Sequence, residues 1–243
     1  ANFNRAEIYN IKKDWNNAVP AYEAVAAQAP NQFAERSVLA AARINFFELK
    51  NYARAEAFYA QLKQITSSQE LKLEAMRGLL RCQYNQQKWA EASENAKELT
   101  AAKGSSADDK TLSNMVIAKS YQVAGQYNEA INSFKSVVQL NKAALAAEAR
   151  YEIANCWFLL NKLTESEKAA FETINKSGSY DYWITKAYIL LGDIYFKQKD
   201  YFNAKATFQS VVENTIDPEL KEEAQVKLSR ATEEEGKSSK VEN

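Results

Sequence analysis

The 243-residue sequence contains 31 basic and 31 acidic residues, no histidine, and only six glycines and three prolines. Few glycines and prolines argue against glycine-rich phosphate loops and against folds built from many tight turns. The lack of histidine excludes a histidine general base, a Ser-His or Cys-His nucleophile pair and a histidine-ligated metal ion. Zero net charge argues against nonspecific binding to nucleic acid, which requires a basic surface. We therefore expect no catalytic residue, metal ion, cofactor or nucleic-acid partner, and an almost entirely helical, alanine-rich chain.

A pair of residues recurs along the chain at a nearly constant interval. An aromatic or large apolar residue is followed three positions later by a small one, and successive pairs stand 36 to 38 residues apart. The pairs are Trp15/Ala18, Tyr52/Ala55, Trp89/Ala92, Tyr127/Ala130, Leu163/Ser166 and Tyr201/Ala204. Such a period is typical of helical-repeat proteins. Each interval holds two stretches with apolar residues at i, i+3, i+4 and i+7, which predicts two amphipathic helices per repeat.

The period predicts one continuous domain over residues 1–235. Its repeats are expected at residues 1–31, 32–68, 69–105, 106–144, 145–178 and 179–216. The leading helix of the first repeat is short, so we expect further repeats upstream of Ala1. The loop Lys103–Ala107 is a junction between repeats, with Asp108 or Asp109 capping the next helix.

The C-terminal segment predicts a single capping helix at residues 217–235, because the last repeat of a solenoid must turn a polar face to water. Asp217 is its expected N-cap and Pro218 its first residue. Residues 236–243 are expected to form a disordered tail.

Cys82 and Cys156 are the only cysteines, and both have apolar or aromatic neighbours in the sequence. We expect them to be small buried side chains. Two cysteines without a CxxC pair do not form a disulfide framework, so they leave the redox compartment open.

The repeat resembles the tetratricopeptide repeat (TPR), whose signature is W-x2-L-G-x2-Y…A-x3-F…P. The last repeat matches this signature with Tyr188, Leu191, Gly192, Tyr195, Ala204 and Phe208. The resemblance implies an all-α, right-handed α-α superhelix, a TPR solenoid of about six helix-turn-helix repeats plus a C-terminal capping helix. Arg43 and Leu80 stand where the second and third repeats should carry a small residue, and Ser166 replaces alanine in the fifth.

A TPR superhelix has a concave groove lined by the first helix of each repeat. The repeat register places the following side chains on this surface: Phe47, Arg77, Arg81, Tyr84, Met115, Lys119, Gln122, Tyr151, Asn155, Phe158, Ile189, Asp193 and Phe196. Aromatic residues, methionine and arginine are enriched in protein interfaces. Arg77, Arg81 and Lys119 either bind a partner carboxylate or are ordinary surface charges. The three phenylalanines either face a partner or pack between repeats.

We interpret the chain as a non-catalytic protein–protein interaction scaffold that binds a partner peptide or helix in its groove. No apolar run is long enough to span a membrane. The stretch from Ala147 to Val212 is similar to repeat proteins of the bacterial cell envelope, including the periplasmic coordinator of the Tol–Pal system and lipoproteins of outer-membrane assembly. This likeness favours a periplasmic or outer-membrane-associated location over the cytoplasm. The alternatives are a cytoplasmic regulatory, peptide-sensing module and an accessory repeat domain of a larger enzyme.

Overall fold

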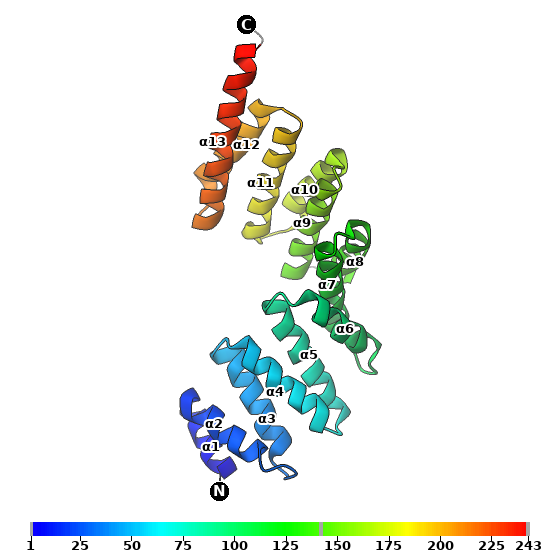
Figure 1. Cartoon of the computed structure of the whole chain (residues 1–243), viewed down its shortest axis with the longest axis vertical. Helices are drawn as coiled ribbons and strands as arrows, with labels where there is room; N and C mark the ends of the chain where they lie inside the picture. Colours follow the sequence, from blue (N-terminus) through cyan, green and yellow to red (C-terminus); the bar gives the residue numbers. More distant parts are fainter. Residues whose placement is uncertain (1, 141–142, 242–243) are drawn as a thin grey trace. The chain divides into compact units, whose positions relative to one another are not determined.

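The computed structural model describes the backbone of residues 2–140 and 143–241 and the side chains of residues 2–140 and 143–237. This part of the chain holds thirteen α-helices and no β-strand (Figure 1). The helices form six pairs followed by one last helix. This arrangement confirms the predicted all-α repeat fold.

The first three pairs are α1 (Asn2–Ile11) and α2 (Trp15–Ala26), α3 (Ala34–Arg43) and α4 (Tyr52–Ile65), and α5 (Gln69–Asn85) and α6 (Trp89–Ala101). The next three pairs are α7 (Ala107–Val123) and α8 (Tyr127–Leu140), α9 (Ala144–Leu159) and α10 (Leu163–Lys176), and α11 (Asp181–Lys197) and α12 (Tyr201–Asn214). The last helix is α13 (Pro218–Val241).

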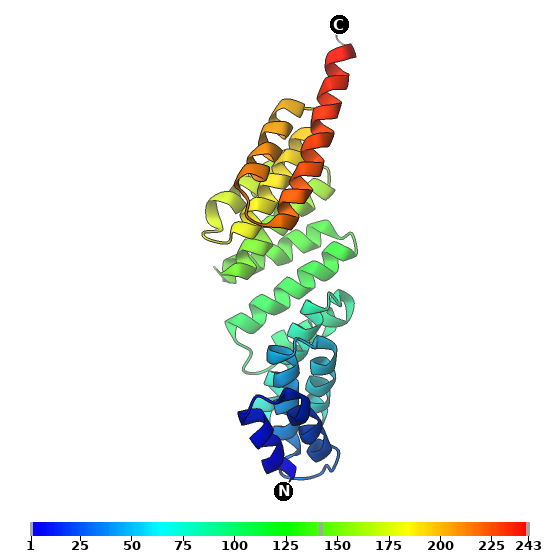
Figure 2. The ribbon, with the colours of Figure 1, turned by 90° about the vertical axis from the view of Figure 1, so that its left-hand side faces the viewer.

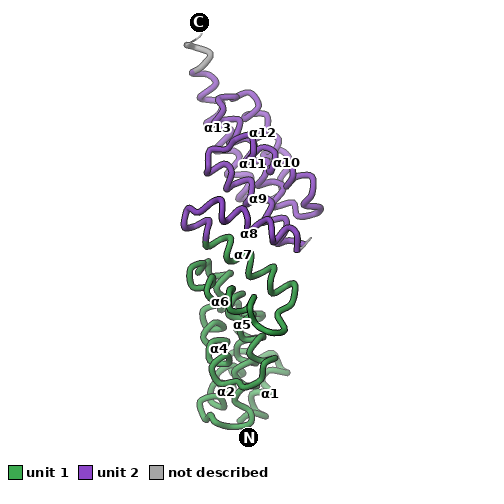
Figure 3. The backbone as a smooth tube through the Cα atoms, turned by 90° about the vertical axis from the view of Figure 1, so that its right-hand side faces the viewer, with its two compact units in different colours: residues 1–120 green, residues 121–243 purple. Residues whose placement is uncertain are grey.

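The chain divides into two compact units, residues 1–120 and 121–243, where the sequence predicts a single domain (Figure 3). The division lies inside α7 and involves no linker. A repeat in a solenoid packs only against its neighbours, so a stack can divide into units without any signal in the composition.

Each pair of helices turns at one residue with left-handed backbone geometry. These residues are Lys13, Lys50, Gln87, Gly125, Asn161 and Lys199, with φ between 53° and 74°. After all but the second of them, the next N–H donates to a carbonyl five residues back, as in Asp200 N to Tyr195 O at 2.9 Å. This hydrogen bond is half of the Schellman motif that ends many helices. Because only one of the six residues is glycine, the turns explain why the chain needs so few.

The two helices of a pair cross where both carry small residues. Ala6 and Ala18 are fully buried in the first pair, as are Ala42 and Ala55 in the second. In the fifth pair Ser166 replaces alanine, and its Oγ donates to the backbone oxygen of Ala154 at 2.8 Å. The replacement is therefore compatible with close packing, because the buried hydroxyl has a partner in the facing helix.

The structure accommodates the large residues Leu80 and Arg43, the other two departures from the repeat signature, in different ways. In the third pair the residue at the crossing is the large Leu80. The facing residue is the small Ala96, at the repeat position that the large Phe208 occupies in the last pair. Both Leu80 and Ala96 are fully buried. The exchange of a large and a small residue across the crossing conserves volume.

The second pair contains a π-helical turn, η1 (Ile44–Glu48), between α3 and α4. A π-turn holds one residue more than an α-turn. The hydrogen bond that ends this helix accordingly runs from Asn51 N to Asn45 O, six residues back. The extra residue brings the buried Ala42 to the crossing and leaves Arg43 at the surface.

The capping residue before α7 is Ser106, not Asp108 or Asp109 as the sequence suggested. Asp109 N donates to Ser106 Oγ at 3.1 Å, and Ser106 N donates to Asp109 Oδ2 at 2.8 Å. This reciprocal pair is a capping box with aspartate at its third position. Asp217 does cap α13, because its Oδ1 accepts from the N–H groups of Glu219 and Leu220 at 3.0 and 3.1 Å.

The predicted disordered tail is wrong for residues 236–241, because α13 continues to Val241 and extends beyond α11 and α12 (Figures 1 and 2). Lys237 pairs with Glu233 and Glu234 at 2.8 Å and so links successive turns of this helix. A single glycine, Gly236, does not end a helix that is otherwise rich in helix formers. Residues 242–243 lie outside the described residues.

The crossing in the last pair gives a direct test of the packing. A methyl group on Gly192 would lie 2.3 Å from Cε1 of Phe208, whose ring is buried. We expect Gly192→Ala to lower the free energy of unfolding by about 1–3 kcal/mol because neither helix can move aside. Urea unfolding followed by circular dichroism measures this change. The control is Gly236→Ala in α13, where a methyl group meets nothing within 4 Å. A Gly192→Ala protein as stable as this control would contradict the close crossing.

Candidate functional site

In the first unit, Arg77 is bound to Asp109 of the next repeat. Its Nε and Nη2 atoms donate to the two carboxylate oxygens at 2.7 and 2.8 Å. Burial alone would raise the pKa of Asp109, but the hydrogen bonds from Arg77 and Ser106 outweigh it and hold the pKa below its usual value. Arg77, predicted to face a partner or solvent, thus has its charge neutralised within the chain.

The same kind of contact joins the first helices of several successive repeats. Arg43 of α3 donates to Glu74 of α5, with Nε 2.8 Å from the carboxylate oxygen. In the second unit, the side-chain nitrogen of Gln122 lies 2.6 Å from Glu152 of α9, which also accepts from Asn155 at 3.2 Å. The predicted site residues Gln122 and Asn155 therefore bind a neighbouring carboxylate, and we name these contacts the polar ladder.

At the end of the second unit, α13 makes the ladder contacts. Lys227 donates to both oxygens of Asp193 at 2.8 and 2.6 Å. Burial raises the pKa of Asp193, although Lys227 opposes this shift. Arg230 of the same helix lies 4.8 Å from the ring centroid of Phe196, which also packs edge-on against Tyr201. α13 thus covers two residues that the sequence assigned to the groove.

The other predicted aromatic residues also have partners inside the chain. Tyr84 packs edge-on against Trp89 with ring centroids 5.4 Å apart. Tyr151 packs against Trp183 at 5.5 Å. The amine of Lys197 lies 4.8 Å from the ring of Phe158. These rings contribute to packing within and between repeats. Lys119 is half-buried in α7 and also has an interaction partner.

Met115 and Ile189 are buried, so neither lies at the surface where the repeat register placed it. The prediction assumed that the first helix of a repeat buries only one face. In the structure, α11 packs against four helices, α9, α10, α12 and α13. Ile189 accordingly lies in a core cluster with Phe208 and Leu220. A helix with neighbours on several sides buries residues that a one-sided pattern places at the surface.

Two of the predicted residues remain open to solvent, and they line the same hollow. Phe47 of η1 is 50% exposed. Arg81 of α5 is exposed, and within the described residues its guanidinium makes no hydrogen bond or ion pair. The hollow has a volume of about 190 Å³ and is bounded by Arg43, Phe46, Phe47, Tyr59, Glu74, Arg77, Gly78 and Arg81. We call it the Phe47–Arg81 pocket.

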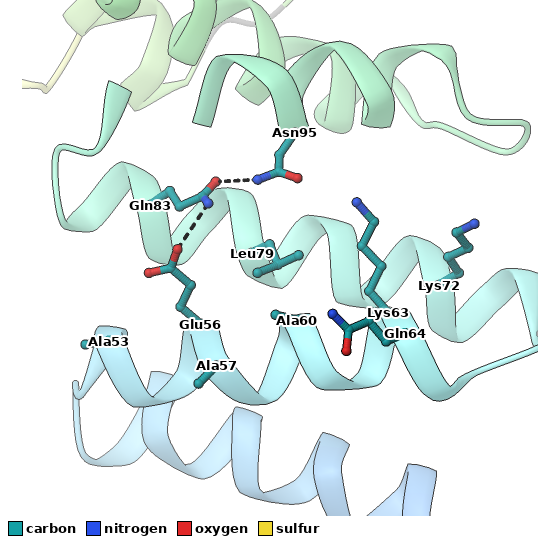
Figure 4. A pocket seen from close by; sticks show the side chains of 10 residues that line it. All are labelled: Ala53, Glu56, Ala57, Ala60, Lys63, Gln64, Lys72, Leu79, Gln83 and Asn95. Atoms are coloured by element: carbon teal, nitrogen blue, oxygen red, sulfur yellow. Dashed lines mark hydrogen bonds between the residues drawn. The ribbon is translucent and has the colours of Figure 1, made fainter. Parts of the chain in front are cut away.

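A larger groove of about 680 Å³ lies between α4, α5 and α6 (Figure 4). Ala53, Ala57 and Ala60 of α4 line one side, together with Leu79 of α5. This groove was not predicted from the sequence, because the repeat register was applied only to the first helix of each repeat. The signal was an alanine stripe at i, i+4 and i+7 on α4, on a different face from the buried residues Ala55, Phe58, Tyr59 and Leu62.

One part of this groove is organised by hydrogen bonds around Glu56. Gln83 donates to Glu56 at 3.1 Å, and Asn95 donates to Gln83 at 3.0 Å (Figure 4). Lys88 completes the set at 2.8 Å from Glu56. Burial favours a higher pKa for Glu56, but the hydrogen bonds from Lys88, Gln86 and Gln83 lower it below its usual value. This carboxylate is satisfied within the chain and offers little to a ligand.

The described residues contain no group of three or more His, Cys, Asp or Glu side chains placed to hold a metal ion. None of their helices combines the length and the apolar character needed to cross a bilayer.

These features define the class of the protein as a helical-repeat solenoid. Two tetratricopeptide repeat family models match the chain, one over residues 115–181 and one over residues 186–214. The chain therefore contains tetratricopeptide repeats within residues 115–181 and 186–214. Such repeats are in general non-catalytic scaffolds for protein–protein interaction. A search of curated protein sequences finds no match.

Solved structures share this fold at low sequence identity. A thermophilic TPR protein of Thermus thermophilus, TTC0263, is 17% identical with a TM-score of 0.55, over 80% of this chain and 99% of that one. BtubC from P. vanneervenii is 15% identical with a TM-score of 0.58, over 80% and 85% of the two chains. Yeast Tom70 is 14% identical with a TM-score of 0.58, and the match covers 90% of this chain but only 43% of Tom70. At these identities the likeness concerns the fold alone.

The polar ladder predicts a specific loss of stability. Arg77→Ala leaves the Asp109 carboxylate, which is 5% exposed, without its cation. We expect the free energy of unfolding to fall by about 1–3 kcal/mol at neutral pH. The pKa of Asp109 is lower in the folded than in the unfolded chain, so this stabilisation is present above about pH 4 and is lost as the pH falls through the folded-state pKa. The difference between variant and parent should therefore shrink in acid.

Urea unfolding at neutral and acidic pH measures this difference. The control is Arg54→Ala, because Arg54 and its partner Glu23 are both well exposed. An exposed pair contributes about 0–1 kcal/mol. Equal losses for the two variants would contradict a special role for Asp109.

The burial of the two cysteines predicts how slowly their thiols react with a reagent in solution. Both thiols are free and buried, as the sequence suggested. Burial, aided by the nearby charge of Glu56, raises the pKa of Cys82 to about 12. Because the thiolate is the reactive species, we expect neither cysteine to react with Ellman's reagent at about pH 8 in the folded protein. Both should react in concentrated guanidinium. Rapid reaction of the folded protein would show that a thiol is accessible.

Proposed function

We propose that this protein is an interaction scaffold and that the Phe47–Arg81 pocket holds an acidic, partly apolar segment of its partner. The observation that carries the proposal is the contrast among three arginines of the first unit. Arg43 and Arg77 are neutralised by Glu74 and Asp109, whereas Arg81 has no carboxylate partner among the described residues. The pocket therefore offers one unused guanidinium.

Arginine suits this role because its planar guanidinium can donate two parallel hydrogen bonds to one carboxylate. The polar ladder holds Glu74 and Asp109 on other arginines, so neither competes for Arg81. The half-exposed ring of Phe47 offers an apolar contact within the same hollow. An aromatic residue beside an arginine is a frequent combination at the energetic centre of protein interfaces.

For the location, we propose the bacterial periplasm or the outer membrane. The support is the similarity of residues 147–212 to repeat proteins of the cell envelope. Fractionation of cells of the source organism, with antibodies against this chain, tests the location. Recovery in the cytoplasm would favour a cytoplasmic regulatory module. Recovery within a larger enzyme would favour an accessory repeat domain.

The binding test compares variants of the pocket with matched changes elsewhere in the first unit. The immobilised chain captures proteins from an extract of the source organism, and the amounts are compared by quantitative mass spectrometry. We expect Arg81→Glu to reduce capture of the specific partner by about 100-fold, and Phe47→Ala by about tenfold, which corresponds to the loss of a charge-assisted contact and of an aromatic contact.

Two controls separate this effect from general changes of charge or hydrophobicity. Lys72→Glu makes the same change of charge on the same helix outside the pocket. Ile11→Ala removes an apolar side chain that is already exposed. If the partners are captured equally by Arg81→Glu and by Lys72→Glu, the Phe47–Arg81 pocket is not the binding site.

A further inference from the structure

The second unit contains a hollow that belongs neither to the polar ladder nor to the predicted groove residues. It has a volume of about 610 Å³ and lies between α11, the C-terminal end of α12 and the start of α13. Its lining residues include Tyr182, Tyr188, Ile216, Asp181, Asp217 and Leu220. We call it the Tyr182–Asp217 pocket. A volume of this size is within the range of ligand-binding pockets.

The apolar part of this pocket is unusually open to solvent. Ile216, in the short loop between α12 and α13, is 99% exposed, and Tyr182 and Tyr188 are 47% and 39% exposed. A large apolar side chain that contacts nothing gives the folded chain no burial energy. Together with the two partly exposed tyrosines, of which Tyr182 packs edge-on against Trp183, Ile216 forms an apolar patch of the kind that marks an interaction site.

The charge of the pocket is negative. Its lining contains Asp181 and Asp217 but no lysine or arginine. Each aspartate lies at the start of a helix, where the helix dipole supplies about half a positive charge. The two carboxylates carry two negative charges, and the two helix N-termini together contribute about one positive charge. The pocket therefore has about one net negative charge. Asp217 Oδ1 caps α13, and within the described residues the Asp181 carboxylate makes no hydrogen bond.

We infer that the Tyr182–Asp217 pocket binds an arginine side chain, with an adjacent apolar residue, presented by a partner protein. One guanidinium would neutralise the net charge of the pocket. Its planar face suits the exposed tyrosine rings, and its donors suit the two carboxylates. Ile216 would contact the apolar neighbour. A purely apolar occupant would cover the carboxylates without neutralising them, which is costly.

The segment proposed for the Tyr182–Asp217 pocket is basic, whereas the segment proposed for the Phe47–Arg81 pocket is acidic. The two proposals can therefore be tested separately. The first pocket offers a cation and selects an acidic segment. The second offers carboxylates and selects a basic segment. Neither proposal requires the other, because the two pockets lie in different units of the chain.

The test uses two capped seven-residue peptides that differ at one position. In both peptides the central residue is followed on each side by a leucine, then a serine, then a terminal glycine. The central residue is arginine in one peptide and glutamate in the other. Each is titrated into the isotope-labelled full chain, and amide chemical shifts are followed by NMR. We expect saturable binding of the arginine peptide with a Kd below about 1 mM, and shifts concentrated around Ile216 and Tyr182.

Variants of the pocket then test the contacts. Asp181→Asn should weaken binding of the arginine peptide about fivefold to tenfold, and Ile216→Ser by a similar factor. Glu222→Gln removes an exposed acid outside the pocket, and Phe202→Ser removes an exposed apolar residue outside it, so both should bind as the parent does. Ile216 is 99% exposed, so its replacement should not affect folding. Arg81→Glu should have no effect on this binding.

Four results would overturn the inference. They are the absence of saturable binding below about 1 mM, equal binding of the two peptides, unchanged binding by Asp181→Asn, and shifts that map away from this pocket. A failure of the acidic-segment proposal would appear instead as unchanged partner capture by Arg81→Glu.

Discussion

The close crossing of the two helices in each repeat is the constraint on which the rest of the structure depends. Gly192 faces the ring of Phe208 so closely that one methyl group has no room. Where the sequence departs from a small residue, the chain compensates locally, by a hydroxyl bonded to Ala154 in the fifth repeat and by an extra residue in a π-turn in the second. Core residues near the crossing also reach the next repeat, since the ring of Tyr59 leaves no room for a methyl group on Gly78.

The polar ladder neutralises several charged side chains within the chain. Arg77 of α5 binds Asp109 of α7, and Lys227 of the capping helix α13 binds Asp193 of α11. These pairs align neighbouring repeats and leave little net charge on their surface. A free guanidinium such as that of Arg81, or an unpaired carboxylate such as that of Asp181, then becomes a specific feature that a partner can recognise.

The candidate site was only partly predictable from the sequence. The repeat register assigned Arg77, Arg81 and Phe47 to one surface, because helical periodicity determines which residues share a face, and these three residues line one hollow. It could not show that Asp109 neutralises Arg77, since the two residues are far apart in the sequence and meet only when repeats stack. It also placed Met115 and Ile189 at the surface, because the pattern of one helix does not reveal how many neighbours surround it.

The sequence by itself determined the class of fold and the number of helix pairs. The physical reason is that these features depend on residues close together in the chain, such as Asp217 before Pro218 or the small residue three positions after each aromatic. Only the tertiary structure decided which charges are neutralised, where the chain divides into two units and which hollows stay open. These features depend on contacts between repeats, whose strength is set by distance and burial rather than by spacing along the chain.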